Sequence, residues 1–134
     1  MANYPNILQR CQDWLDDNGL RPQIDNDGVL YFKYQMLNFV IIWSEDDAPF
    51  LRILLPVIWS IDNEAEAEQV LIACNKVNMQ RKVIKTFTTN NNTFMSVELL
   101  VQDDFDPSQI LERSLEMLVQ GYQFFANEMR GQQN

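Results

Sequence analysis

The stretch that decides the fold is VLYFKYQMLNFVIIWSEDDAPFLRILLPVIW, residues 29–59. Blocks of apolar and β-branched residues alternate in it with turn-forming residues at positions 35–38 and 45–49. Together with a short strand near residues 23–25, the pattern predicts about four strands, the others being at residues 29–34, 39–44 and 50–59. Connections this short suit antiparallel neighbours, because parallel strands need a crossover of about a dozen residues. We therefore expect an antiparallel meander, with a bulge or sheet edge at Pro56.

Helical spacing frames this meander on both sides. Before it, apolar residues recur every three or four positions from Tyr4 to Leu15. After it, we expect a helix over residues 63–79 and a last helix from Asp106 to about Arg130, with strands at residues 81–88 and 93–102 between them. The last helix carries the widest apolar stripe, formed by Leu111, Leu115, Leu118, Tyr122, Phe125 and Met129. The predicted fold is α+β, an antiparallel β-sheet with helices packed on it in the order α-β(3-4)-α-β-β-α.

Length and charge narrow the class of protein. The 134 residues suit one α+β domain over residues 1–134, with residues 131–134 as a frayed tail. The formal net charge of −9 and the pI near 4.3 weigh against nucleic-acid binding. Histidine is absent, which excludes catalytic triads and metal sites that depend on it. We expect no enzyme activity.

No motif in the chain indicates a cofactor or a metal. Cys11 and Cys74 have no partners at metal-ligand spacing, so we expect two buried apolar thiols, with a disulfide between them as the alternative. The run from Asp25 to Gly28 suits a hairpin turn better than a calcium loop, because a hydrophobic strand follows it directly. The carboxylates at Asp103, Asp104 and Asp106 are explained by solvation and by capping of the last helix.

The start of the chain lacks the basic and apolar regions of a signal peptide. The longest apolar runs, residues 39–43 and 53–59, are far shorter than the roughly 20 residues of a membrane span. We therefore expect a cytoplasmic protein with no membrane partner.

The strands carry one informative irregularity. Charged residues interrupt one of the two alternating sets of side chains in each strand, at Lys33, Arg52, Lys85 and Glu98. If these charges point outward, aromatic residues point outward with them. The candidate partner-binding residues are then Tyr31, Lys33, Phe50, Arg52, Lys85 and Phe87. The alternative is that the last helix covers part of this face; residues 39–43 are apolar in both sets and give no orientation.

The order of elements, with Cys-Asn-Lys-Val-Asn at residues 74–78 ending the middle helix, resembles the YbjN-type family of bacterial sensory transduction regulators. An acidic turn before Phe50 and the Asp-Pro start of the last helix add to the likeness, which would cover residues 4–129. The chain is also similar to type III secretion chaperones in fold. The resemblance implies a small, non-catalytic protein that binds other proteins and is usually dimeric.

Two functions follow as expectations. The first is a protein-binding or chaperone-like regulatory domain, a homodimer without cofactors, that holds an apolar segment of an unknown protein partner on its sheet. The surplus of apolar strand residues and the wide stripe of the last helix favour the homodimer. The alternative is a small-molecule binding or enzymatic domain with a pocket between sheet and helices.

Overall fold

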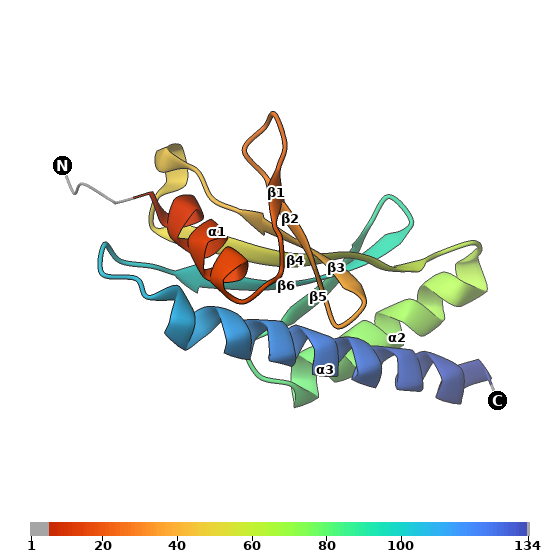
Figure 1. Ribbon diagram of the computed structural model, residues 1–134. Helices are drawn as coiled ribbons and strands as arrows, with labels where there is room; N and C mark the ends of the chain where they lie inside the picture. The colour runs from red at the N-terminus through yellow and green to blue at the C-terminus, as the bar shows by residue number, and fades with distance from the viewer. Residues whose placement is uncertain (1–5, 134) are drawn as a thin grey trace.

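The structure, a computed structural model, describes residues 6–133, with side chains through residue 131. All six strands form one antiparallel sheet in the order β1-β2-β3-β4-β6-β5. The strands are β1 (Gln23–Ile24), β2 (Leu30–Tyr34), β3 (Leu37–Ile42), β4 (Phe50–Ser60), β5 (Lys85–Thr89) and β6 (Asn92–Leu100) (Figure 1). The predicted α+β fold and the antiparallel meander are confirmed.

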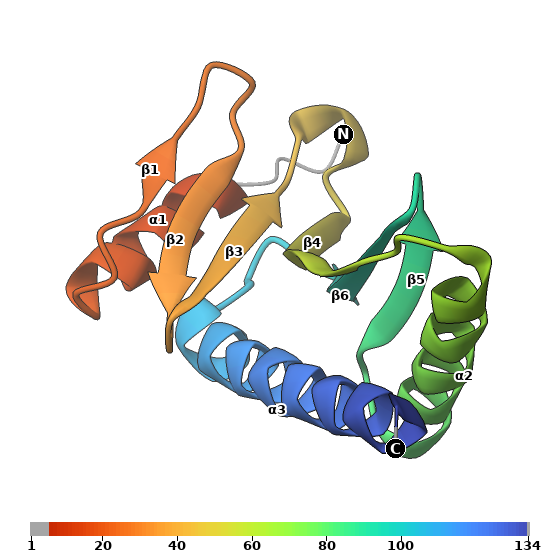
Figure 2. The same ribbon diagram turned by 90° about the vertical axis from the view of Figure 1, so that its right-hand side faces the viewer.

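Three helices cover one face of the sheet. They are α1 (Ile7–Asp17), α2 (Glu64–Gln80) and α3 (Pro107–Gln133); a short 3-10 helix, η1 (Glu45–Asp47), lies between β3 and β4. In Figure 2, α1 lies behind β1 to β3, α2 lies beside β5, and α3 runs below both halves of the sheet. The two ends of the sheet are therefore supported by different short helices, and α3 connects them.

The turns follow the chemistry of the backbone. Asn90 and Asn91 have φ of 50° and 62° and form the hairpin between β5 and β6, as asparagines in left-handed geometry should. Pro56 lies in the register shift of β4 between Leu55 and Trp59, so the predicted bulge is confirmed. The residues from Asp25 to Gly28 form a turn in which Asp25 Oδ1 accepts backbone hydrogen bonds from Asp27 and Val29.

Several element boundaries differ from the sequence prediction. Helix α1 is capped by the side chain of Asn6 and begins at Ile7; Tyr4 lies outside the described residues. Strand β5 begins at Lys85, later than predicted, because the chain after α2 turns through Val83 at φ 75°. Helix α3 continues to Gln133, so it is longer than predicted.

The core lies between the sheet and α3. The predicted stripe of α3 is buried at Leu111, Leu115, Leu118, Phe125 and Met129, while Tyr122 is half-buried. Gly121 faces the same core, and a Cβ there would lie 2.3 Å from Ile84 Cδ1, so a larger residue would require the side chains of Ile84 and Met95 to shift. The stripe is thus used inside the protomer, and it cannot supply the surface of a homodimer.

Candidate functional site: the outer face of the sheet

The sheet has a second face, which the helices leave uncovered. We call it the outer face and define it by the strand side chains that point away from the helices. In β2, buried Leu30 and Phe32 alternate with exposed Tyr31 and Lys33. All six candidate residues lie on the outer face, namely Tyr31, Lys33, Phe50, Arg52, Lys85 and Phe87. The predicted orientation of these strands is confirmed, and their role in binding stays a prediction.

Strand register divides the candidate residues into two groups. Tyr31 and Lys33 lie on β2, opposite Val40 and Asn38 of β3. The other four lie on β4 and β5, on either side of β6, which pairs with both of these strands. Strand β3 separates the two groups.

The alternation pattern does not predict which residues of β3 point to the outer face. Because Val40 pairs with Leu54, and Ile42 pairs with Arg52, both side chains belong to the outer face. Val40 is nevertheless 8% exposed, which shows that neighbouring side chains cover it. The pairing of β3 with β2 and β4 gives this orientation, and the sequence of β3 does not, since both of its alternating sets are apolar.

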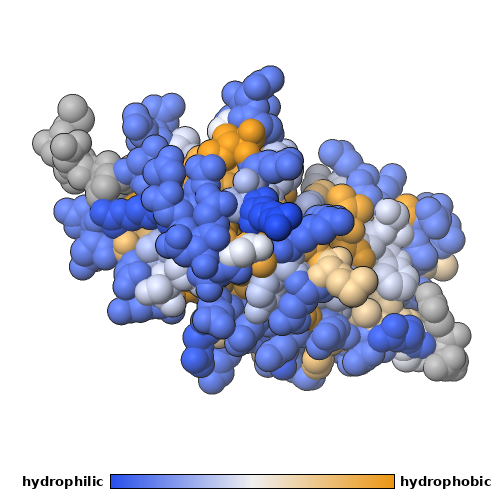
Figure 3. Space-filling model, in the orientation of Figure 1, coloured by the Kyte–Doolittle hydropathy of each residue, from blue (hydrophilic) through white to orange (hydrophobic). Residues whose placement is uncertain are grey.

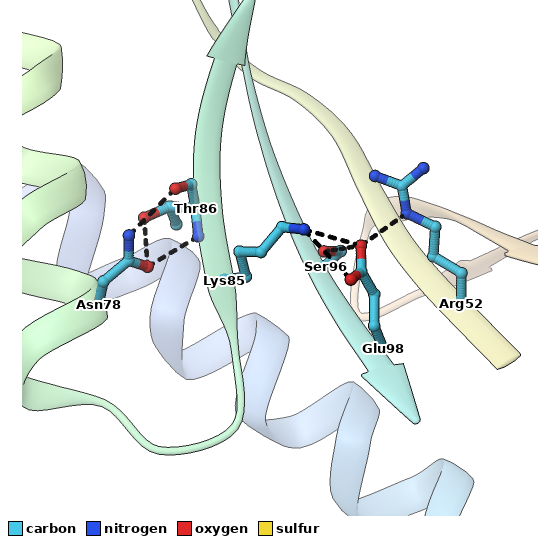
Figure 4. A network of polar contacts seen from close by, with 6 residues as sticks. All are labelled: Arg52, Asn78, Lys85, Thr86, Ser96 and Glu98. Atoms are coloured by element: carbon cyan, nitrogen blue, oxygen red, sulfur yellow. Dashed lines mark hydrogen bonds and ion pairs between the residues drawn. The ribbon is translucent and has the colours of Figure 1, made fainter. Parts of the chain in front are cut away.

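A polar network occupies the half of the outer face formed by β4, β5 and β6 (Figure 4). Glu98 lies between two cations: its Oε1 is 3.2 Å from Arg52 Nε and 3.1 Å from Lys85 Nζ. The Ser96 hydroxyl donates to the same oxygen at 3.5 Å. The network therefore fixes the positions of both cations while leaving one positive charge in excess.

The cations also lie over an aromatic ring. Arg52 Cζ and Lys85 Nζ are 5.6 Å and 5.3 Å from the centroid of Phe87, within the range of cation–π attraction. Phe87 in turn stacks on Phe94, with ring centroids 5.6 Å apart. The cations and rings thus lie together on one part of the outer face, in contact with one another.

We expect this ion network to contribute little to stability. Its side chains are 38–54% exposed, and exposed ion pairs are typically worth less than about 1 kcal/mol. Replacing Glu98 by Gln should therefore change the free energy of unfolding by less than about 1 kcal/mol, with the difference shrinking in high salt. Urea denaturation at low and high ionic strength measures this. A loss of several kcal/mol would mean that the network is a structural core element.

Two hollows open on the outer face. One, of about 520 Å³, is lined by Tyr31, Lys33, Asn38, Val40, Pro56 and residues that precede β1. The other, of about 540 Å³, is lined by Ile42, Trp43, Ser44, Asp47, Phe50, Leu51, Arg52 and Glu98. The first hollow combines apolar side chains with Arg21 and Lys33, and the second combines apolar side chains with Arg52 and the carboxylates of Asp47 and Glu98. Such a mixture of apolar and charged groups is typical of a protein-binding surface.

The β1–β2 turn positions Tyr31 at the rim of the first hollow. The Tyr31 hydroxyl donates to Asp25 Oδ2 at 3.0 Å. The backbone N–H of Val29 is the main cause that lowers the pKa of Asp25, and the bond to Asp25 raises the pKa of Tyr31. The Asp25–Gly28 segment therefore acts as a turn that orients an aromatic ring. Among the described residues, no cluster of three or more His, Cys, Asp or Glu side chains could hold a metal ion.

Cys11 and Cys74 are free and buried, far from this surface chemistry. Burial raises the pKa of Cys11 from 9.0 to about 12, and burial is also the main cause that raises the pKa of Cys74. A raised pKa favours the neutral thiol in the folded state, so its stabilising effect is full below pH 9 and is lost as the pH rises towards 12.

This shift predicts a measurable pH dependence. Between pH 8 and pH 10, the wild-type protein should lose about 1.4 kcal/mol more free energy of unfolding than a Cys11→Ala variant. All other titrating groups are common to both proteins, so their contributions cancel in the difference between wild type and variant. Chemical denaturation of the two proteins at both pH values gives the difference; equal losses would show that the thiol is not buried as described.

Apolar residues are also exposed outside the outer face, mostly on and around α2. Those on and around α2 are Val57, Leu71, Ile72, Met79 and Val83, and the others are Ile24 in β1 and Met36 in the β2–β3 turn. In Figure 3 the visible surface is largely hydrophilic, with hydrophobic areas below the β1–β2 hairpin and near the part of β4 that leads to α2. Leu71 is 57% exposed, although its spacing predicts burial; Ala73 takes the buried position. This second area lies away from the outer face of the sheet, and it supplies matched control residues.

Comparisons with known proteins agree with the fold. A search of solved structures gives the crystal structure of YbjN from E. coli, described as "a putative transcription regulator", with a TM-score of 0.68 and 16% sequence identity, covering 97% of this chain and 96% of that one. No curated protein matches the chain significantly. No helix among residues 6–133 is long and apolar enough to cross a membrane. The YbjN family model, "Putative bacterial sensory transduction regulator", matches residues 8–122, so the chain belongs to the YbjN family.

Proposed function

We propose that this protein is a non-catalytic regulatory domain that binds other proteins through its outer face. The observation that supports this most is a sheet face with exposed aromatic side chains and no helix over it. Tyr31 and Phe50 are 45% and 50% exposed, and Leu100 is 77% exposed. Large apolar areas on a monomer usually mark an interaction site, and the family description as a regulator supports a binding role.

The mode of binding that we propose is chaperone-like. An apolar segment of the partner would lie on the sheet, with its side chains in the two hollows of the outer face. Phe87 and Phe94 offer a flat stacked surface beside the second hollow, and aromatic residues are prominent in binding hot spots. We place this activity in the cytoplasm.

Truncation of the exposed rings tests the proposal. Tyr31→Ala and Phe50→Ala should each change the free energy of unfolding by about 0.5 kcal/mol or less, since both rings are exposed. Phe87→Ala should cost about 1 kcal/mol, because it loses a stacked partner. Each should weaken association with the partner or with a second copy by about tenfold or more, because interface hot spots exceed about 1.4 kcal/mol.

Leu71→Ala is the matched control, because it removes an equally exposed apolar side chain from α2. Thermal melts and association assays on the four variants give the answer. If association survives all three outer-face truncations, or falls only for Leu71→Ala, the proposed surface is wrong.

The outer face also supports a homodimer, which we propose as its self-associated form. Because the α3 stripe is buried, the outer face is the surface on which this dimer rests. Light scattering should give about twice the 15.8 kDa of the chain. A mass near 15.8 kDa at all concentrations would contradict the dimer.

No observation favours the alternative of a small-molecule site between sheet and helices. That space is filled by side chains such as Phe39, Leu51 and Met95, which are at most 1% exposed. The two hollows described above open on the opposite face.

A further inference from the structure

The net charge of the strands is opposite in sign to the net charge of the whole chain. The sequence has 10 basic and 19 acidic residues. The six strands nevertheless contain three basic residues, Lys33, Arg52 and Lys85, and one acidic residue, Glu98. All four point to the outer face, which therefore carries an excess of two positive charges on a protein of net charge −9.

Arg52 has a free binding edge. Its Nε faces Glu98, while its two terminal nitrogens point away from that carboxylate (Figure 4). No hydrogen bond from these two nitrogens is made to the described residues. The contact with Glu98 is an ion pair, since Arg52 Nε makes no hydrogen bond among the described residues. A guanidinium that is open at its Nη atoms can donate two parallel hydrogen bonds to an incoming carboxylate.

The two hollows lie at a fixed spacing along β3. Asn38 lines the first and Ile42 lines the second, four residues further on, which corresponds to about 13 Å in a strand. Arg21 and Lys33 stand at the first hollow, and Arg52 stands at the second together with Asp47 and Glu98, so the two linings together carry three cations and two carboxylates. An extended segment crossing both would place side chains four residues apart in the two hollows, with each hollow next to a cation.

From this juxtaposition we infer the chemistry of the partner, an inference that rests on the proposed function. The outer face binds an extended, acidic protein segment with two apolar side chains four residues apart and carboxylates beside them. Arg52 is the main carboxylate-binding residue, and Glu98 and Phe87 are positioning residues that hold its guanidinium. Such a segment complements the positive outer face, whereas a basic segment would meet like charge there.

Selection from a random peptide library tests this inference. Twelve-residue peptides displayed on phage are selected on the wild-type protein, and those that also bind the Tyr31→Ala, Phe50→Ala double variant are discarded. We expect the remaining peptides to be net negative, with aliphatic or aromatic residues at four-residue spacing. Face-dependent peptides that are neutral or basic would overturn the inference while leaving the proposed function intact. A selection with no face-dependent peptide would count against both.

A charge variant tests the role of Arg52. Arg52→Gln should weaken binding of a selected acidic peptide by about tenfold, as expected for a charge-assisted bidentate pair. Replacing the carboxylates of that peptide by amides should abolish the difference between wild type and variant. Arg113→Gln is the control, because it removes the same charge from an exposed position on α3. If both variants bind the peptide more weakly by the same factor, the effect comes from net charge alone. The assignment of Arg52 as the main carboxylate-binding residue would then be wrong.

Discussion

Replacing Phe125 by Ala should lower the free energy of unfolding by about 3–5 kcal/mol, the largest effect that we expect from a single substitution. Phe125 is fully buried on α3, and its ring meets Trp59 edge-on at a centroid distance of 6.0 Å and an angle of 68°. Trp59 follows the bulge in β4. The truncation therefore leaves a cavity where α3 packs against the far end of the longest strand.

Urea denaturation of Phe125→Ala beside Phe50→Ala checks this prediction. The two substitutions remove the same ring, one from the core and one from the outer face, where Phe50 is half exposed. The exposed position should cost about 0.5 kcal/mol or less. Similar losses for both would mean that the two faces of the sheet are not distinguished as the structure has them.

Replacing Asn78 by Ala should lower the free energy of unfolding by about 2 kcal/mol, the second largest effect that we expect. The reason is that the Asn78 side chain joins α2 to the edge strand β5. Asn78 Oδ1 accepts from the backbone N–H of Thr86 at 2.8 Å, and its Nδ2 donates to the Thr86 carbonyl at 3.1 Å. Thr86 is 4% exposed, and its Oγ1 lies 2.8 Å from the same Oδ1. Removing the amide takes this partner from the backbone N–H and carbonyl of Thr86, which typically costs about 1–3 kcal/mol, while the Thr86 hydroxyl still donates to the carbonyl of Cys74 at 3.1 Å.

Asn75→Ala is the control for this prediction. Asn75 is exposed on the same helix, and alanine favours a helix more than asparagine does. The free energy of unfolding of the Asn75→Ala variant should therefore be unchanged or slightly raised. Protection of the β5 amides from hydrogen exchange should fall in Asn78→Ala and not in Asn75→Ala. If both variants keep wild-type stability and protection, Asn78 does not anchor the edge strand.

Local chemistry predicts much of the fold. The change of hydrophobic period separates strands from helices, the asparagines at positions 90 and 91 define a turn, and Pro56 defines the bulge. The turn between β2 and β3 is harder, because Gln35 and Met36 take φ of 48° and 67° without the usual glycine or asparagine. The pattern predicts a turn at residues 35–38, but it does not predict this left-handed geometry, which the pairing of β2 with β3 imposes on Gln35 and Met36.

The arrangement of side chains on the outer face depends on which strands pair and in which register. No single segment of the sequence contains this information. Alternation within β2 and β4 is enough to orient Tyr31 and Phe50. It does not show that Glu98 lies between Arg52 and Lys85, because that depends on the register between β4 and the β5–β6 hairpin, which α2 separates from β4 in the sequence. The hydrogen bonds between Asn78 and Thr86 could not be predicted for a related reason. Asn78 belongs to the segment that carries part of the family resemblance, but its partner is known only once the position of β5 beside α2 is known.

Site-specific photo-crosslinking tests the central claim, that the outer face binds proteins, most directly. A photoreactive phenylalanine derivative replaces either Phe50 on the outer face or Leu71 on α2, two apolar positions of similar exposure. Illumination in the native cells should give a defined protein adduct at position 50, with a partner or with a second copy, and no adduct at position 71. An adduct at position 71 alone, or at neither position, would contradict the account.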